Sequence, residues 1–199
     1  ALAGVGLSAL QIAGGVGAIA SHFSSRRKTE YPGEKRQTRI LDAVFRNALW
    51  RLKKKPECAK YIQGNSMEDP AAALEKMYGG GLNKNRVLYG GGGMIKPNGS
   101  IDDSAVADTH GLGKGSEATI FLNDAFFDKS VGGWKGTLGT HNARTMVLLH
   151  ELRHALSGIG HPIHRNPDRT IDVLKTSNDP ESNENFMKNI AKKCFGVTL

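Results

Sequence analysis

The sequence has few aromatic residues, only two cysteines and no sustained repeat, and these shortages exclude several classes of protein. Aromatic residues make up 7% of the 199 residues. Apolar residues reach 39%, which is enough for a folded core and excludes full disorder. Neither a Gly-X-Y period nor sustained heptads occur, so collagen-like and coiled-coil architectures are excluded. The length favours one domain, or one domain with an appendage.

The two cysteines, Cys58 and Cys194, lack the Cys-x-x-Cys spacing of zinc ribbons and thioredoxin-like motifs. A metal site built from cysteines is therefore not expected. Both lie near the ends of the segment that is expected to fold, so a disulfide between them would close most of the domain. Two unrelated buried thiols are the alternative, and the sequence favours neither.

Acidic residues are outnumbered, with 19 Asp and Glu against 27 Lys and Arg, which gives a formal net charge of +8. Much of the excess lies in two short runs at residues 25–28 and 53–55. This balance is compatible with nucleic acid, an anionic membrane or an acidic protein as partner. The basic residues are not interleaved with aromatic residues, so nucleic-acid binding or nuclease activity is the less favoured alternative.

Residues 1–20 carry no charge, and their length matches a bilayer span. Eleven of them are Gly or Ala, so their hydrophobic drive is weak. Basic residues follow from Arg26 onward. We predict that residues 1–36 are an appendage, either membrane-active or a linker, and that residues 37–199 form the folded domain.

Residues 37–199 are predicted to form an α+β domain that is mostly helical. Apolar residues recur at helical spacing from 37 to 55, and Pro56 is expected to end that helix. Asp-Pro pairs at 69–70 and 179–180 predict the starts of two further helices. The last helix places one apolar stripe along its length, formed by Phe186, Met187, Ile190 and Cys194.

Strands are expected at 86–89 and 117–127, where apolar and β-branched residues cluster. The remaining glycine-rich stretches, 79–115 and 132–140, are expected to be loops. The fold expected is thus a small sheet next to a set of helices.

A further helix is expected at about 142–157, and it contains His150-Glu151-Leu152-Arg153-His154, the pattern H-E-x-x-H. Residues four apart lie one above the other on a helix, so His150 and His154 can converge on one tetrahedral ion. Zinc lowers the pKa of a bound water toward ~7, and the carboxylate of Glu151 can then remove its proton. A random shuffle of this composition gives roughly 0.01 occurrences of the pattern, so chance is a weak explanation.

The segment MVLLHELRHAL resembles the active-site helix of the zincin metallopeptidases, and EATIFLN upstream resembles the edge strand of their substrate cleft. The resemblance implies a zincin-like fold, with a small sheet packed on the H-E-x-x-H helix. It implies that His150 and His154 are zinc ligands and that Glu151 is the catalytic base. It also implies a protein or peptide substrate that adds to the edge strand by backbone pairing.

A glycine-rich lead-in, the H-E-x-x-H helix and a Cys-Phe pair near the end resemble a second group. These are metallopeptidase-like domains at the C-termini of bacterial RHS-repeat and polymorphic-toxin proteins. This resemblance implies a bacterial toxin or effector that is secreted or membrane-associated, with membrane contact through residues 1–20 and an inhibitor or immunity protein as a candidate partner. The alternative is a non-enzymatic membrane-anchored domain, but its structural zinc would normally have four protein ligands and would not need Glu151.

The third zinc ligand departs from the metzincin pattern H-E-x-x-H-x-x-G-x-x-H, because Gly158 and His161 each come one residue late. We predict His161 as this ligand, since one inserted residue in a glycine turn can still deliver the imidazole to the metal. The alternatives are His164, Asp168, Glu181 and Glu184. Either glutamate would make the site similar to that of the gluzincins.

Two further roles stay open at this point. Arg153 could bind a substrate carboxylate, but a structural ion pair with Asp168 or Asp172 is preferred. A residue that stabilises the tetrahedral oxyanion is also expected. The candidates are Tyr78, Tyr89, His110 and His164, and the sequence does not rank them.

Overall fold

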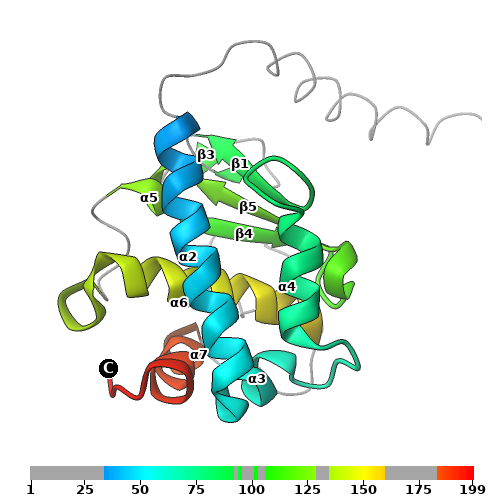
Figure 1. Ribbon diagram of the computed structural model, residues 1–199, viewed down its shortest axis with the longest axis vertical. Coiled ribbons are helices and arrows are strands. Elements are labelled where there is room, and N and C mark those ends of the chain that lie inside the picture. The colour runs from blue at the N-terminus through cyan, green and yellow to red at the C-terminus, as the bar shows by residue number, and fades with distance from the viewer. Residues whose placement is uncertain (1–33, 92–93, 96–100, 103–105, 129–134, 160–182) are drawn as a thin grey trace, which may run out of the picture. The chain divides into compact units, whose positions relative to one another are not determined.

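In the described part of the chain, helices pack around a small three-stranded sheet (Figure 1). The computed structural model describes residues 34–91, 94–95, 101–102, 106–128, 135–159 and 183–199. The predicted class, α+β and mostly helical with a small sheet, is confirmed at this level. The boundary at residue 36 and the membrane contact through residues 1–20 stay predictions, because residues 1–33 lie outside the described part. Among the described helices, none combines the length and the apolar character needed to cross a bilayer.

Helix α2 (Glu34–Lys54) is the amphipathic helix expected at 37–55, and it buries one side in the core through Leu41, Val44, Ala48 and Leu52. As predicted, α2 ends at Lys54, just before Pro56, but the sequence did not predict that another helix begins at Pro56. This proline occupies the first turn of α3 (Pro56–Gln63), where the missing N–H of proline would have no helical partner in any case. This unpredicted helix brings Cys58 and Tyr61 into the core of the fold.

Helix α4 (Pro70–Tyr78) begins as the Asp-Pro signal predicts. The Asp69 carboxylate accepts a hydrogen bond of 2.8 Å from the backbone N–H of Ala72. The Tyr78 ring stacks on Phe45 of α2, with 4.0 Å between the ring centroids. The end of α4 is therefore joined to α2 by aromatic packing.

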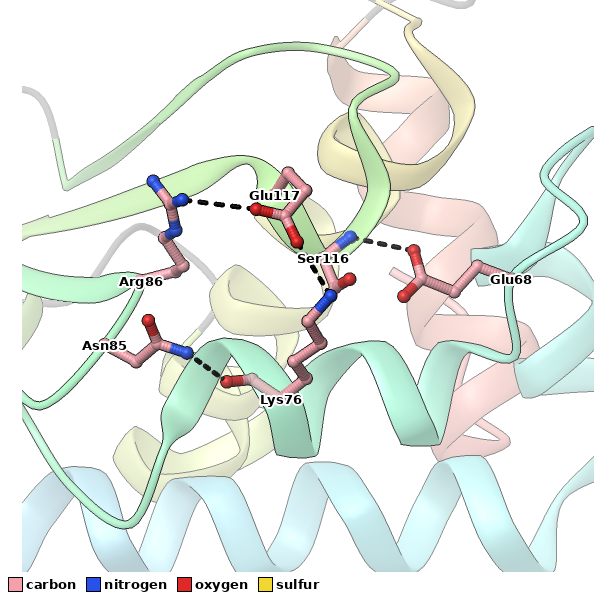
Figure 2. A network of polar contacts seen from close by, with 6 residues as sticks. All are labelled: Glu68, Lys76, Asn85, Arg86, Ser116 and Glu117. Carbon is pink, nitrogen blue, oxygen red and sulfur yellow. Dashed lines mark hydrogen bonds and ion pairs between the residues drawn. The ribbon is translucent and has the colours of Figure 1, made fainter.

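Exposed polar contacts join α4 to the short 3-10 helix η1 (Gly115–Glu117) and to the residue before the first strand (Figure 2). Lys76 Nζ lies 2.7 Å from Glu117 Oε1, and Arg86 Nη2 lies 3.2 Å from Glu117 Oε2. The backbone N–H of Ser116 donates to Glu68 over 2.8 Å. These contacts anchor η1 just before the chain enters the sheet.

The three-stranded sheet has the order β1–β5–β4, made of Val87–Gly91, Thr119–Asn123 and Ala107–His110. Strand β5 runs parallel to β1 and antiparallel to β4. The prediction that EATIFLN forms the edge strand is wrong, because β5 is the central strand. Its edge neighbour β4 lies within the stretch 79–115, for which the sequence predicts a loop. A four-residue strand of sequence ADTH carries no apolar alternation that could have revealed it.

Two smaller elements also differ from the expected pattern. The strand expected at 117–127 is strand only in its first part, because Asp124–Phe127 form the short helix α5. A separate antiparallel pair joins β2 (Met94–Ile95) to β3 (Ile101–Asp102), within the stretch expected to be loop.

Helix α6 (Lys135–Ser157) carries the H-E-x-x-H motif and packs against β4, β5, α3 and α4. Gly139 has φ 72° and ψ 154°, so the helix is interrupted there and the segment with the motif begins after it. The helical turn before Gly139 differs from the loop that the sequence predicts at 132–140. In the segment with the motif, the apolar residues Met146, Leu149, Leu152 and Ala155 are fully buried.

Helix α7 (Asn183–Ile190) continues into a π-helical turn, η2 (Ala191–Phe195). The predicted apolar stripe is confirmed, since Phe186, Met187, Ile190 and Cys194 are all buried. Cys194 forms a disulfide with Cys58 of α3, which settles the question that the sequence left open. The bridge joins the last elements of the chain to α3 across 136 residues of sequence.

Candidate active site

The imidazoles of His150 and His154, one helical turn apart on α6, converge on one point. Their Nε2 atoms lie 2.9 Å apart, and the two ring planes are inclined by 81°. Both residues are buried. The spacing of four residues therefore presents two nitrogen donors side by side.

The ring of His154 is oriented from its other nitrogen. Its Nδ1 hydrogen-bonds with the backbone carbonyl of Ile159, just beyond the end of α6. Because a carbonyl only accepts, we assign the proton to Nδ1, which leaves the lone pair of Nε2 available to bind a cation.

Glu151 lies between β4, which is an edge strand of the sheet, and the imidazole pair. Thr109 of β4 donates its hydroxyl to Glu151 Oε2 at 2.7 Å, and the same oxygen of Thr109 is 3.1 Å from the Glu151 backbone carbonyl. The other carboxylate oxygen, Oε1, lies 4.0 Å from His150 Nε2. One oxygen of Glu151 is thus held by the sheet, while the second faces the imidazoles.

The carboxyl of Glu151 has a raised pKa in the metal-free protein. Burial raises its pKa to about 8, although the hydrogen bond from Thr109 acts in the opposite direction and Asp108 adds a small upward effect. The cause is that a buried charge loses its hydration.

A close backbone crossing fixes β4 against the end of α6. The N–H of Gly113, in the loop after β4, donates to the His154 carbonyl at 3.1 Å. Gly113 has φ 72°, and a Cβ there would lie 3.2 Å from the Cα of Gly158. A side chain at this crossing would push the loop away from the motif.

Phe186 of α7 contacts both imidazoles. Its ring stacks nearly parallel on His154 (centroids 5.1 Å apart, 8° between planes) and meets the His150 ring edge-on at 4.6 Å. The guanidinium of Arg153 lies 4.4 Å from the centre of the Phe186 ring and 3.7 Å from that of Tyr61 of α3. Arg153 therefore lies between rings from α3 and α7, a cation–π arrangement that the sequence did not suggest. Its predicted partners, Asp168 and Asp172, lie outside the described residues.

The predicted third ligand lies beyond the described part of the chain. His161, His164, Asp168 and Glu181 all fall in residues 160–182, and the side chain of Glu184 on α7 is also outside it. Among the side chains that are described, no group of three or more His, Cys, Asp or Glu residues could hold a metal ion. The zinc site and His161 as its third ligand therefore stay predictions.

The four candidates for the oxyanion donor are separated by the fold. Tyr78 donates its hydroxyl to Asp42 of α2, and Tyr89 donates to Asp124 of α5. His110 lies on β4 next to Thr109, where a hydrogen bond with Asp108 raises its pKa. His164 lies outside the described residues. Of the three described candidates, His110 is the one that lies next to Thr109, the residue of β4 that contacts Glu151 of the motif helix.

The two imidazoles fit zinc in kind and in spacing. Two nitrogen ligands, each about 2.0–2.1 Å from a tetrahedral zinc ion, lie about 3.3 Å apart. The observed separation of 2.9 Å between the Nε2 atoms would need to open by only a few tenths of an ångström.

Sequence reasoning missed Thr109 and the contact of Phe186 with the imidazoles. A single threonine in a glycine-rich stretch gives no signal, and Phe186 was identified only as part of the core.

Comparison with known proteins yields no relative, since no family model matches the chain and no match was found among curated proteins or solved structures.

Proposed function

We propose that this protein is a zinc-dependent metallopeptidase in which His150 and His154 hold the metal and Glu151 is the general base. The observation that carries the proposal is the arrangement of three side chains on one buried stretch of α6. The Nε2 atoms are 2.9 Å apart, and Glu151 Oε1 lies 4.0 Å from one of them. A nitrogen pair for the ion and an acid for its water are thus side by side.

A bound zinc ion would supply a water of lowered pKa and would polarise the scissile carbonyl. Glu151 Oε1 is placed to accept a proton at the imidazole pair and to pass it to the leaving amine. The hydroxyl of Thr109 keeps Oε2 engaged, so the same carboxylate oxygen is always presented. The carbonyl of Ile159 holds the His154 ring in the orientation that exposes Nε2.

The third ligand is proposed to be His161, with His164, Asp168, Glu181 and Glu184 as alternatives. The contact of His154 with Ile159 supports His161, because Ile159 comes only two residues before His161 and its carbonyl holds the chain next to the His154 ring. The contact of Phe186 with both rings brings α7 to the same place and supports Glu184. Zinc content measured for alanine variants of each residue separates these alternatives.

The edge of β4 supports an extended peptide as substrate. Asn123 N–H donates to the Val106 carbonyl, and the register then pairs Ala107 with Leu122 and Thr109 with Ile120. In an antiparallel ladder, hydrogen-bonded pairs alternate with pairs that are not hydrogen-bonded to each other. Because Val106 and Asn123 form a hydrogen-bonded pair, Ala107 and Thr109 belong to the other kind, and their backbone groups face the outer edge. A substrate strand that paired with these groups would lie beside the motif helix.

A secreted protein is proposed because disulfides persist in oxidising compartments, and Cys58 and Cys194 form one. The role as a bacterial toxin or effector domain rests on the resemblance to RHS-associated metallopeptidase-like domains.

The decisive comparison is Glu151→Gln against Glu117→Gln, with an unfolded protein such as reduced casein as substrate. We expect Glu151→Gln to retain zinc but to lose about 10²–10⁴-fold in proteolysis, because the general base is removed. Glu117 lies in the exposed network of Figure 2, so its variant should match the parent. Equal activity of Glu151→Gln and the parent would refute the proposal. Zinc binding without proteolysis by the parent would support the non-enzymatic alternative instead.

A further inference from the structure

The outward face of α2 carries cations along its whole length. Arg36, Arg39, Arg46, Lys53 and Lys54 are all exposed. Trp50 lies among them with 52% of its surface exposed. At 3.6 residues per turn these six residues fall within an arc of about 100°, and Lys35 and Ala43 are the other residues of α2 on that arc. The outward face is defined here by these six residues.

The cations of this face are little neutralised within the described part. Lys53 pairs with Glu75 at 2.8 Å, whereas no described ion pair involves Arg36, Arg39 or Arg46. Asp42, at the border of the face, accepts a hydrogen bond from Tyr78. The face extends over about 27 Å at 1.5 Å per residue, so it presents a row of positive charge to a partner. Helix α2, blue to cyan in Figure 1, runs across the front of the view.

We infer that the outward face of α2 docks on an anionic lipid bilayer. Positive charge spread along one side of a straight helix is complementary to a flat, negatively charged surface. Tryptophan prefers the interface between water and lipid, and Trp50 is the only exposed aromatic residue of large size in the described part. The proposal is independent of the zinc site.

A bilayer fits this face better than nucleic acid does. Binding of single strands uses a series of aromatic side chains, and this face has one. The sequence that precedes α2 contains the uncharged residues 1–20 and the basic residues Arg26, Arg27 and Lys28, a composition suited to the same surface. Because that segment is not acidic, we do not expect it to cover the positively charged outward face itself.

The test measures binding of the full chain to vesicles of phosphatidylcholine, with and without phosphatidylglycerol. Each cation near an anionic surface changes the partition coefficient about fivefold, so Arg39→Gln with Arg46→Gln should weaken binding about 25-fold. Lys84→Gln with Lys114→Gln is the matched control, because both lysines are exposed, lie off the face and carry the same total charge. In a Trp134→Phe background, the emission of Trp50 should shift to shorter wavelength when anionic vesicles are added.

Equal binding by the two double variants would overturn the inference, because the attraction would then depend on net charge or on another segment. Equal binding to vesicles of phosphatidylcholine alone would also overturn it. Duplex DNA that competes with the vesicles, is bound more tightly and depends on the same arginines would assign the face to nucleic acid instead. Thermal unfolding of each variant verifies that the fold is intact.

Discussion

Two glutamates of this protein, Glu151 and Glu117, have pKa values shifted in opposite directions. Glu151 is buried between β4 and α6, where loss of hydration raises its pKa to about 8. The side chain of Glu117 is 59% exposed, and the hydrogen bond and charge of Lys76, with Arg86 beside them, lower its pKa. The environment, rather than the residue type, decides at which pH each carboxyl group ionises.

The two regions contribute differently to the protein. The exposed network of Figure 2 joins α4, η1 and Arg86, the residue before β1, through contacts that water and salt weaken. The buried carboxyl of Glu151 keeps its proton up to about pH 8, because it has lost its hydration and no cation is among the neighbours that shift its pKa. Strongly perturbed groups of this kind concentrate at functional sites.

The largest effect is expected from the disulfide, because it joins α3, which carries Tyr61, to η2, which follows α7 with Phe186. Tyr61 contacts Arg153, and Phe186 contacts both imidazoles. Replacing Cys58 and Cys194 by alanine should lower the free energy of unfolding by about 5 kcal/mol, as the chain-entropy model gives for a loop of this length. Urea denaturation measures the change. Reduced wild-type protein should unfold like the double variant, and a loss below about 1 kcal/mol would show that the bridge is not what holds these elements.

The metal-free protein should become less stable as pH rises from about 4.5 to about 8. Because the pKa of Glu151 is about 8 when folded and 4.5 ordinarily, the folded state keeps a proton that the unfolded state releases in this range. The free energy of unfolding should therefore fall by a few kcal/mol. Urea denaturation with a chelator at pH 5 and pH 8 measures it. Glu151→Gln should lose most of this dependence and Glu117→Gln should retain it, whereas identical profiles for Glu151→Gln and the wild type would contradict the assignment.

Removing the hydroxyl that orients Glu151 should have an intermediate effect. We expect Thr109→Val to lower kcat about 10–100-fold without changing zinc content or KM, because the carboxylate would no longer be held by Oε2. Thr109→Ser should restore most of the activity, since it keeps the hydroxyl. An effect of Thr109→Val on zinc content alone would point to a general disturbance of α6 instead.

The smallest effect is expected in the exposed network. Lys76→Met should change the thermal midpoint by less than about 2 °C, and the change should disappear at high salt. Proteolysis should be unaffected. A large loss of stability would mean that the contacts of η1 position β5 more strongly than their exposure suggests.

The helices with strong periodicity or capping could be predicted from the sequence, and so could the side-by-side placement of His150 and His154. The sheet could not be, because strand order is decided by contacts between distant segments: β5 is central although its residues resemble an edge strand. Pro56 fits both the end of one helix and the start of the next, so α3 was missed. The contact of Thr109 with Glu151 depends on the packing of β4 against α6, which the sequence does not reveal.

The most direct test of the central claim is the amount of zinc bound by purified protein, measured by elemental analysis after dialysis. We expect about one zinc ion per chain in the wild type and in Glu151→Gln, and none in His150→Ala or His154→Ala. A wild-type protein that binds no zinc, or histidine variants that retain it, would contradict a metal site at His150 and His154.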